Sequence, residues 1–285
     1  MTIQNLLYVA GLVFVSVSLI VLGDTFGKLL TSEGFAPATI AFSRFFIGAL
    51  VILAFSGLKL HELRIFTDWR ILLRATLVTG AILCILTALK TEPIANVFGA
   101  FFIGPVVSYG LAVLFLKERP TAGRLLFLGL GFAGVMLVVK PGFGTSIGIL
   151  FALLSGFFYG CFLAATRLVA QVARPRLLLL TQLAFGSVLL APLGLSAPLP
   201  DITLPLSGWV LGSALCSAAG NYLLLIANRH AEASLIAPLI YTQLVSATIV
   251  GYFVFSDVPD SVSMIGLGMI LLSGAGSLWI RWQDR

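Results

Sequence analysis

The sequence predicts an all-α integral membrane protein, with ten transmembrane helices arranged as two inverted five-helix repeats and both termini in the cytoplasm. Three observations predict this fold class: the composition, a series of apolar runs of helix length, and an internal repeat. Of the 285 residues, 59% are hydrophobic and only 10% are charged, whereas soluble domains have about 25% charged residues. A soluble fold could not bury this much apolar surface, so the chain belongs in a bilayer.

Ten apolar segments approach or exceed the roughly 20 residues that a helix needs to cross a membrane. Charged residues and Pro- or Gly-rich breaks separate them. The predicted spans are 5–30, 36–56, 72–90, 94–115, 123–140, 146–167, 177–195, 207–227, 232–254 and 261–281. The first run is too long for the core of a signal peptide, so we expect it to remain as a helix.

Basic residues are concentrated on one predicted side of the membrane. If the N-terminus is cytoplasmic, thirteen of the seventeen fall in cytoplasmic loops or the tail. These are Lys59, Arg64, Arg70, Arg74, Lys117, Arg119, Arg124, Arg167, Arg174, Arg176, Arg229, Arg281 and Arg285. The asymmetry predicts cytoplasmic termini. The stretch 57–70 ("GLKLHELRIFTDWR"), with Trp69, is interpreted as an interfacial connection, and a short amphipathic recognition helix is the alternative.

The second half of the chain repeats the first. Residues 92–120 align without a gap with residues 231–259 at an offset of 139, which places Glu118 on Asp257, and Lys28 falls on Arg167 at the same offset. Because five helices are an odd number, the second copy enters the membrane from the opposite side. Inverted repeats recur in secondary transporters, so we predict repeats at 1–142 and 143–285 within one membrane domain.

Several motifs resemble the EamA-like family of the drug/metabolite transporter superfamily. In the first repeat the resemblance rests on Gly23, Lys28, Pro37, Arg44 and "LAVLFLKERPTAGRLLFLGLGFAGVMLVVKPG". In the second repeat it rests on Arg167, Gln182 and "VGYFVFSDVPD". Leu22 and Asp24 depart from the family pattern, which often has Trp and a small or amide residue there. The resemblance implies a multi-pass transporter of the cytoplasmic (inner) membrane, often an exporter of amino acids or related metabolites.

Three charged residues are candidates for substrate binding or coupling, because a charge in the bilayer core costs about 2.5–3.5 kcal/mol. Arg44 lies roughly 12 Å inside the second span, and we expect it to face a central cavity or pair with an acid, with an interfacial anchor as the alternative. Hydropathy alone leaves Asp24 and Lys28 as an exposed ion pair in an outer loop. Taken with the resemblance, we expect a helix to about residue 30, with the pair on one face near Arg44. Two cations and one anion suit an anionic or zwitterionic substrate.

Aromatic and amide residues within the spans complete the predicted site. These candidates are Asn96, Phe98, Phe102, Tyr159, Asn221, Tyr222, Tyr241 and Gln243. Packing against helices or lipid is the alternative for the aromatic rings, and interhelical hydrogen bonding is the alternative for the polar groups. Pro105 and Pro238 predict bends that are either hinges or static. The glycine runs at 129–134 and 266–276 indicate close packing, and Glu118 and Asp257 are expected to cap helices.

These observations predict a secondary transporter for a small organic metabolite, such as an amino acid, a carboxylate or a related anionic or zwitterionic solute. We expect alternating access and export or exchange. An importer of a larger aromatic metabolite or vitamin such as a flavin is the alternative, and a channel or an intramembrane enzyme are the alternatives of another class. His61 and His230 fall in loops and no enzyme motif occurs, so we expect no catalytic residue, cofactor or metal.

The expected partners are the small-molecule substrate, the lipid bilayer and a proton or counter-substrate that drives transport. Asp24 is the predicted titrating group. No nucleic acid is expected, and a homodimer is allowed for.

Overall fold

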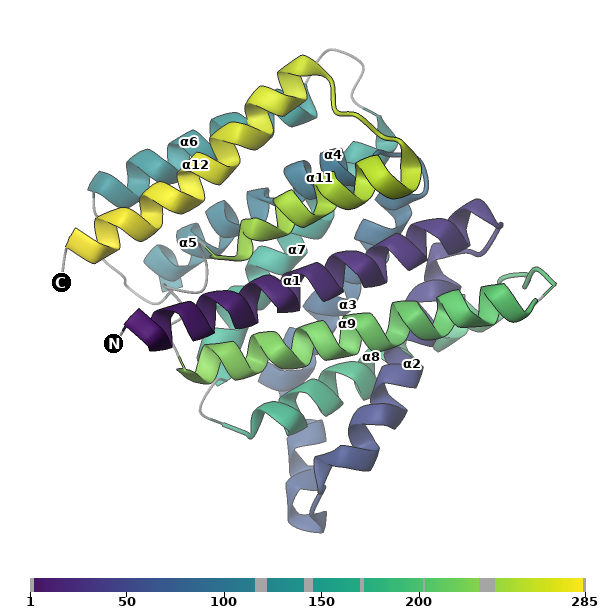
Figure 1. The fold of residues 1–285 in the computed structure, drawn as a ribbon. Helices are drawn as coiled ribbons and strands as arrows, with labels where there is room; N and C mark the ends of the chain where they lie inside the picture. Colours follow the sequence, from purple (N-terminus) through teal and green to yellow (C-terminus); the bar gives the residue numbers. More distant parts are fainter. Residues whose placement is uncertain are drawn as a thin grey trace.

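The computed structural model describes residues 3–115, 122–140, 146–169, 172–201, 203–230 and 239–283. All regular structure in these ranges is helical, as Figure 1 shows. Seven described helical stretches are long and apolar enough to cross a membrane, counting the interrupted stretch Ile94–Phe115 as one, and three shorter apolar helices accompany them. The predicted all-helical membrane fold is confirmed. The count of ten crossings and the cytoplasmic position of the termini stay predictions.

Each predicted span overlaps a described helix. In the first half these are α1 (Ile3–Ser32), α2 (Pro37–Ser56), α3 (Trp69–Leu89), α4 (Ile94–Phe101), α5 (Ile103–Phe115) and α6 (Ala122–Val139), with a 3-10 helix, η1 (Leu60–Thr67), before α3. In the second half they are α7 (Ile147–Val169), α8 (Pro175–Ser196), α9 (Leu204–His230), α11 (Thr242–Phe255) and α12 (Ser261–Gln283).

Local sequence signals set several helix ends. α2 and α8 begin at Pro37 and Pro175, whose fixed φ suits the first turn and which have no amide hydrogen left unpaired there. α2 ends at Ser56, and its C-cap residue, Gly57, adopts a left-handed φ of 55°. Asp68 accepts a hydrogen bond from the Arg70 amide at 2.9 Å and so caps α3. That cap starts α3 three residues earlier than predicted.

The predicted cap of the last helix was wrong. Asp260, not Asp257, precedes α12, and its Oδ1 accepts hydrogen bonds from the amides of Val262 and Ser263 at 3.0 and 3.1 Å. Lys140 donates to Asp260 Oδ2 at 2.6 Å, and this contact holds the pKa of the carboxyl well below its usual range. Glu118 and Pro238, also named in the predictions, lie outside the described residues.

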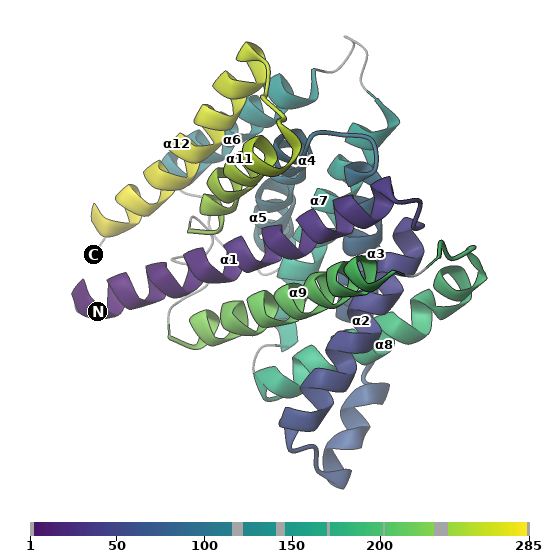
Figure 2. The ribbon, with the colours of Figure 1, turned by 45° about the vertical axis from the view of Figure 1, so that its right-hand side comes forward.

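Helices of the two halves pack in exchanged pairs. α1 packs along α9 and α3 along α7, so the first helix of each half lies against the third of the other. The remaining helices pack like on like: α2 on α8, α6 on α12, and α4 on α11. Figures 1 and 2 show the α6/α12 and α2/α8 pairs on opposite sides of the bundle, with α1 and α9 side by side between them. A two-fold axis between two repeats produces this pattern.

One hydrogen bond occurs twice, in equivalent places. Ser16 of α1 donates to the Gly220 carbonyl of α9 at 2.7 Å, and Ser155 of α7 donates to the Ala81 carbonyl of α3 at 2.7 Å. The two serines differ by 139 in number, and so do the two acceptors. Both serines are fully buried. The repeat in the sequence is therefore also a repeat of contacts.

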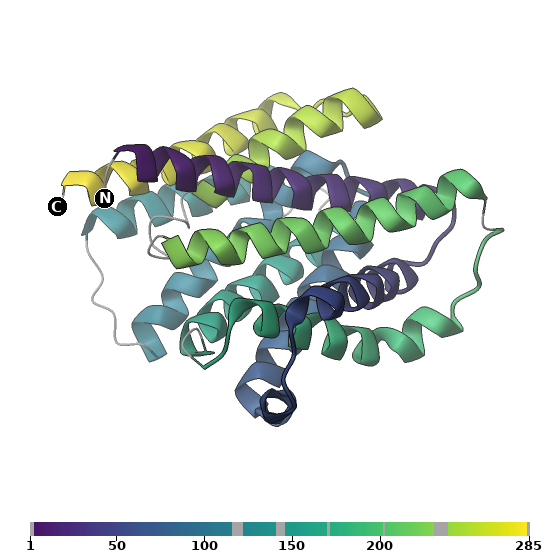
Figure 3. The same ribbon diagram turned by 60° about the horizontal axis from the view of Figure 1, so that its bottom comes forward.

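The bundle has two ends, which we name after a basic residue at each. At the Lys28 end, Lys28 pairs with Asp257 at 3.1 Å, and at the Arg174 end, Arg174 pairs with Glu62 at 2.7 Å. α1 begins and α12 ends close together (Figure 3). Lys28 lies near the C-terminal end of α1. The beginning of α1 and the end of α12 therefore lie at the other end of the bundle, the Arg174 end.

The predicted close packing of the two glycine runs is confirmed. A Cβ on Gly134 of α6 would lie 2.6 Å from the Gly266 carbonyl oxygen, and a Cβ on Gly266 of α12 would lie 2.6 Å from the Gly134 carbonyl oxygen. Small residues allow this backbone contact, which is a main source of attraction between helices in lipid.

We predict that Gly134→Ala separates α6 from α12 and lowers stability by about 1–3 kcal/mol, the usual cost of overpacking. Gly129→Ala, on the same helix, is the matched control, because nothing lies within 4 Å of its Cβ position. Thermal unfolding of both variants in detergent micelles checks this. Equal melting temperatures for the two variants would contradict the close contact of α6 with α12 at Gly134.

Candidate functional site

The candidate site centres on two helix breaks that meet between the halves. Phe102 separates α4 from α5, and Tyr241 is a turn residue directly before α11. The two residues are related by the offset of 139. Their rings stack, with centroids 4.9 Å apart and planes at 18°. Equivalent interruptions of the fourth helix of each half therefore face each other.

Pro105 accounts for the break in the first half. It has no amide hydrogen to donate to the Phe101 carbonyl, so the helical ladder is interrupted there. The freed carbonyl approaches α7 where Gly156 lacks a side chain, and the Gly104 carbonyl approaches Gly160 in the same way. The helix is interrupted close to Pro105, and this segment packs tightly against α7.

Aromatic rings extend from these breaks in a continuous row, which we call the aromatic row. It runs from Tyr241 of α11 through Phe102 and Phe101 to Tyr159 and Phe162 of α7. Successive ring centroids are 4.9, 6.1, 4.9 and 5.6 Å apart. Both halves contribute to the row, so three of the predicted aromatic residues share one interface.

Other residues of α4, α5 and α11 are buried or carry buried polar atoms. Phe98 is fully buried and meets Phe101 edge-on at 6.2 Å, and Gln243 is buried on α11 two residues beyond Tyr241. The Oδ1 atom of Asn96 and the hydroxyl of Tyr109 are buried without a hydrogen-bond partner among the described residues. Such groups cost about 1–3 kcal/mol when unsatisfied. A polar ligand that reached them would recover that cost.

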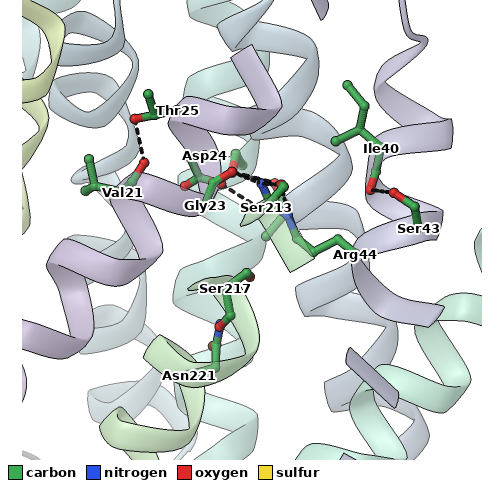
Figure 4. A network of polar contacts seen from close by, with 12 residues as sticks. Val21, Gly23, Asp24, Thr25, Ile40, Ser43, Arg44, Ser213, Ser217 and Asn221 are labelled. Carbon is green, nitrogen blue, oxygen red and sulfur yellow. Dashed lines mark hydrogen bonds and ion pairs between the residues drawn. The ribbon is translucent and has the colours of Figure 1, made fainter. Parts of the chain in front are cut away.

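Arg44 of α2 is held by residues of α1 and α9 (Figure 4). Its Nη1 donates to Asp24 Oδ1 at 2.6 Å, and its Nη2 donates to the Gly23 carbonyl at 2.8 Å. Nε and Nη2 also donate to the Ser213 hydroxyl at 3.2 and 2.9 Å, which in turn donates to the Gly23 carbonyl at 2.9 Å. Arg44 is 3% exposed. The sequence-based expectation that Arg44 pairs with an acid is correct.

The expected Asp24–Lys28 pair does not form. Lys28 instead donates to Asp257 at 3.1 Å and to the Glu92 carbonyl at 2.8 Å, and its ammonium lies 4.6 Å from the Phe255 ring centroid. The helix does continue past residue 30, as predicted, but the two charges find separate partners. The region therefore has two anions for its two cations, so the predicted excess of positive charge is absent.

Asn221 and Tyr222 on α9 lie apart from these groups. Asn221 donates to the Ser217 carbonyl of its own helix at 2.8 Å, and Figure 4 shows it farther along α9 than Ser213. The Tyr222 hydroxyl accepts a hydrogen bond from Arg176 at 2.9 Å. Tyr222 therefore makes the interhelical hydrogen bond that was the alternative to substrate contact, whereas the hydrogen bond of Asn221 stays within α9.

Arg74 is a buried residue that the sequence interpretation assigned to a cytoplasmic loop. It lies in α3 and is 1% exposed. Its Nε donates to Thr166 of α7 at 2.9 Å, its Nη1 donates to the Leu178 carbonyl of α8 at 3.3 Å, and its guanidinium lies 4.6 Å from the Phe162 ring centroid. The predicted span 72–90 already contained Arg74, and this indicated a position inside the membrane. The count of basic residues in cytoplasmic loops nevertheless included it.

We predict that Asp24→Leu destabilises the protein by about 3–5 kcal/mol, because it leaves the Arg44 charge buried and unpaired. The double variant Asp24→Leu, Arg44→Met should recover most of that loss, since it removes both charges. Thermal or denaturant unfolding in micelles measures the effect. Lys28→Met, at a pair 16% and 26% exposed, is the control and should cost about 1 kcal/mol or less. A double variant no more stable than Asp24→Leu would refute the pairing as the cause.

Comparison with known proteins gives consistent matches along the chain. The model of the EamA-like transporter family matches twice, at residues 7–140 and 146–279. An uncharacterised transporter of Helicobacter pylori is 24% identical over 86% of each chain. A riboflavin transporter of Rhizobium johnstonii is 27% identical, covering 83% of this chain and 79% of its own.

Two further matches concern a named uptake protein and a solved fold. An S-adenosylmethionine uptake transporter of Rickettsia felis is 26% identical, covering 81% of this chain and 79% of its own. A crystal structure superposes with a TM-score of 0.69 at 17% identity, covering 96% of this chain and 99% of that chain. This last likeness concerns the fold alone.

Proposed function

This chain belongs to the EamA-like transporter family, and from that premise we propose that it is a secondary transporter that carries a small organic metabolite across the cytoplasmic membrane by alternating access. The observation that carries the proposal is the meeting of the two helix breaks at Phe102 and Tyr241. In transporters built from inverted repeats, interrupted helices at equivalent positions form the substrate site near the middle of the membrane.

The aromatic row favours a substrate with a planar ring. Stacked rings such as Phe102 and Tyr241 present large, rigid apolar faces to a ligand that enters between or beside them. Relatives named for riboflavin and S-adenosylmethionine transport handle molecules that contain aromatic ring systems. We therefore place a ring-bearing metabolite ahead of an aliphatic amino acid or carboxylate, which revises the order of the two substrate classes.

The direction of transport has two supported readings. The family resemblance favours export or exchange, whereas one relative is named for uptake, which favours import. Basic residues gather at the Arg174 end. Lys59 directly precedes η1, Arg174 donates to Glu62 of η1, and Arg176 donates to the Phe55 carbonyl of α2. By the positive-inside rule we assign that end to the cytoplasm.

Both ends of the bundle are bridged by polar contacts between the halves. Lys28 of α1 holds Asp257 at one end, and Arg174, just before α8, holds Glu62 of η1 at the other. Alternating access requires one set of contacts to open while the other stays closed. We assign these pairs as the two closures. A proton or counter-substrate drives the cycle in this scheme, and protonation of Asp24 would release Arg44 from its ion pair.

We predict that Phe102→Ala and Tyr241→Ala weaken binding of a ring-bearing substrate about 2- to 10-fold, as expected for the loss of one stacked aromatic contact. Riboflavin, S-adenosylmethionine and phenylalanine are the probes, first by thermal shift of purified protein and then by counterflow in proteoliposomes with the ligand that stabilises most. Phe157→Ala, an aromatic residue of α7 that is 49% exposed on the outside of the bundle, is the matched control.

If Phe102→Ala and Tyr241→Ala both left the affinity for the substrate unchanged, a substrate site at the helix breaks would be contradicted. Equal losses in Phe157→Ala would do the same, because that ring lies outside the site.

A further inference from the structure

Among the residues that the structure describes, two arginines are buried, and only one of them has a carboxylate partner. Arg44 is 3% exposed and has the Asp24 carboxylate at 2.6 Å. Arg74 is 1% exposed, yet no carboxylate of the described residues pairs with it. The contrast is between a neutralised cation and a cation without a counter-charge.

The repeat explains where the missing acid would be. Adding 139 to Asp24 gives Leu163 on α7, and adding 139 to Arg74 gives Ser213 on α9. One cluster joins α1, α2 and α9, and its counterpart joins α7, α8 and α3. Each contains a buried guanidinium, but only the first contains an acid. At the position equivalent to Asp24, the second cluster has an apolar side chain, Leu163.

The present contacts of Arg74 leave part of its hydrogen-bonding capacity unused. A guanidinium has five N–H donors. Nε donates to Thr166 and Nη1 donates to the Leu178 carbonyl, whereas Nη2 takes part in none of the hydrogen bonds of the described residues. An anion that accepted hydrogen bonds from Nη2 and from the second Nη1 hydrogen would satisfy the remaining donors of the guanidinium.

The energetic balance also calls for an anion. Burying an unpaired charge costs several kcal/mol even after relaxation. The Phe162 ring at 4.6 Å offsets part of this cost, and two neutral acceptors offset a further part. A negatively charged ligand beside Arg74 would be strongly favoured, because the cost of desolvating the cation has already been met in folding.

Arg74 lies at one end of the aromatic row. Phe162, the ring that it covers, is the last member of the aromatic row that begins at Tyr241. We infer that Arg74 binds a carboxylate or phosphate group of the transported metabolite while the substrate's ring lies along the aromatic row. The inference rests on the proposed function, and it moves the anion-binding role from Arg44, whose donors are already engaged, to Arg74.

The first test uses a matched pair of probes, benzoate and benzamide, which share a ring and differ in charge. Thermal shift of the purified wild-type protein should show stronger stabilisation by benzoate. In Arg74→Gln the benzoate advantage should disappear, whereas Arg176→Gln, which removes an exposed arginine at the Arg174 end, should keep it. Arg74→Lys retains the charge and should retain part of the advantage, which covers the case in which Arg74→Gln does not fold.

Two results would overturn the inference: benzoate no better than benzamide in the wild type, or a benzoate advantage that persists without the Arg74 charge. The proposed function fails separately, through Phe102→Ala and Tyr241→Ala. If those variants lose substrate affinity while Arg74→Gln keeps it, the site at the helix breaks stands and the role of Arg74 falls.

The second test asks whether an anion from water reaches position 74. In a background with Cys84, Cys161 and Cys216 changed to Ser, Arg74→Cys and Ser213→Cys place a thiol at repeat-equivalent positions. We expect 2-sulfonatoethyl methanethiosulfonate to modify the thiol at position 74 at least tenfold faster in proteoliposomes. Equal rates, or a protected thiol at position 74, would make Arg74 a purely structural link between α3, α7 and α8.

Discussion

Close contact between helix backbones is the constraint on which the rest of this structure depends. In a bilayer, lipid tails are as apolar as the side chains, so helices gain little by hiding apolar surface from them. Here Ser16 and Ser155 reach carbonyls on the opposite half, and Gly134 and Gly266 bring two backbones together. The charged side chains of Asp24, Arg44 and Arg74 are buried among these packed helices.

The buried charges of the described residues fall into two clusters, whose chemistry differs although their positions are equivalent. The cluster around Arg44 is closed, because an acid, a hydroxyl and a carbonyl engage its donors. This gives the unusual Asp24 a physical reason: it neutralises an arginine that would otherwise be costly to bury. The cluster around Arg74 has no carboxylate among the described residues and adjoins aromatic rings, so the proposed anion binding falls on that side of the axis.

Much of the fold was predictable because it depends on short-range signals. Segment length and composition predicted the spans. The offset of 139 predicted that Phe102 and Tyr241 are equivalent, but it did not predict that their rings stack. The partner of Lys28 was not predictable, since Asp257 lies 229 residues away and no local pattern links them. Arg74 was misplaced for another reason: a rule about loop charges was applied to a residue inside a span, where burial and not topology decides its role.

The axis between Phe102 and Tyr241 has a consequence for how a ligand is oriented. A molecule that lies across a two-fold axis meets the same backbone shape from either direction, so shape alone cannot distinguish head from tail. The distinction must come from the positions at which the halves differ chemically. A phenyl group at Phe102 faces a phenol at Tyr241, and a guanidinium at Arg74 corresponds to a hydroxyl at Ser213. These few substitutions give a symmetric scaffold its polarity.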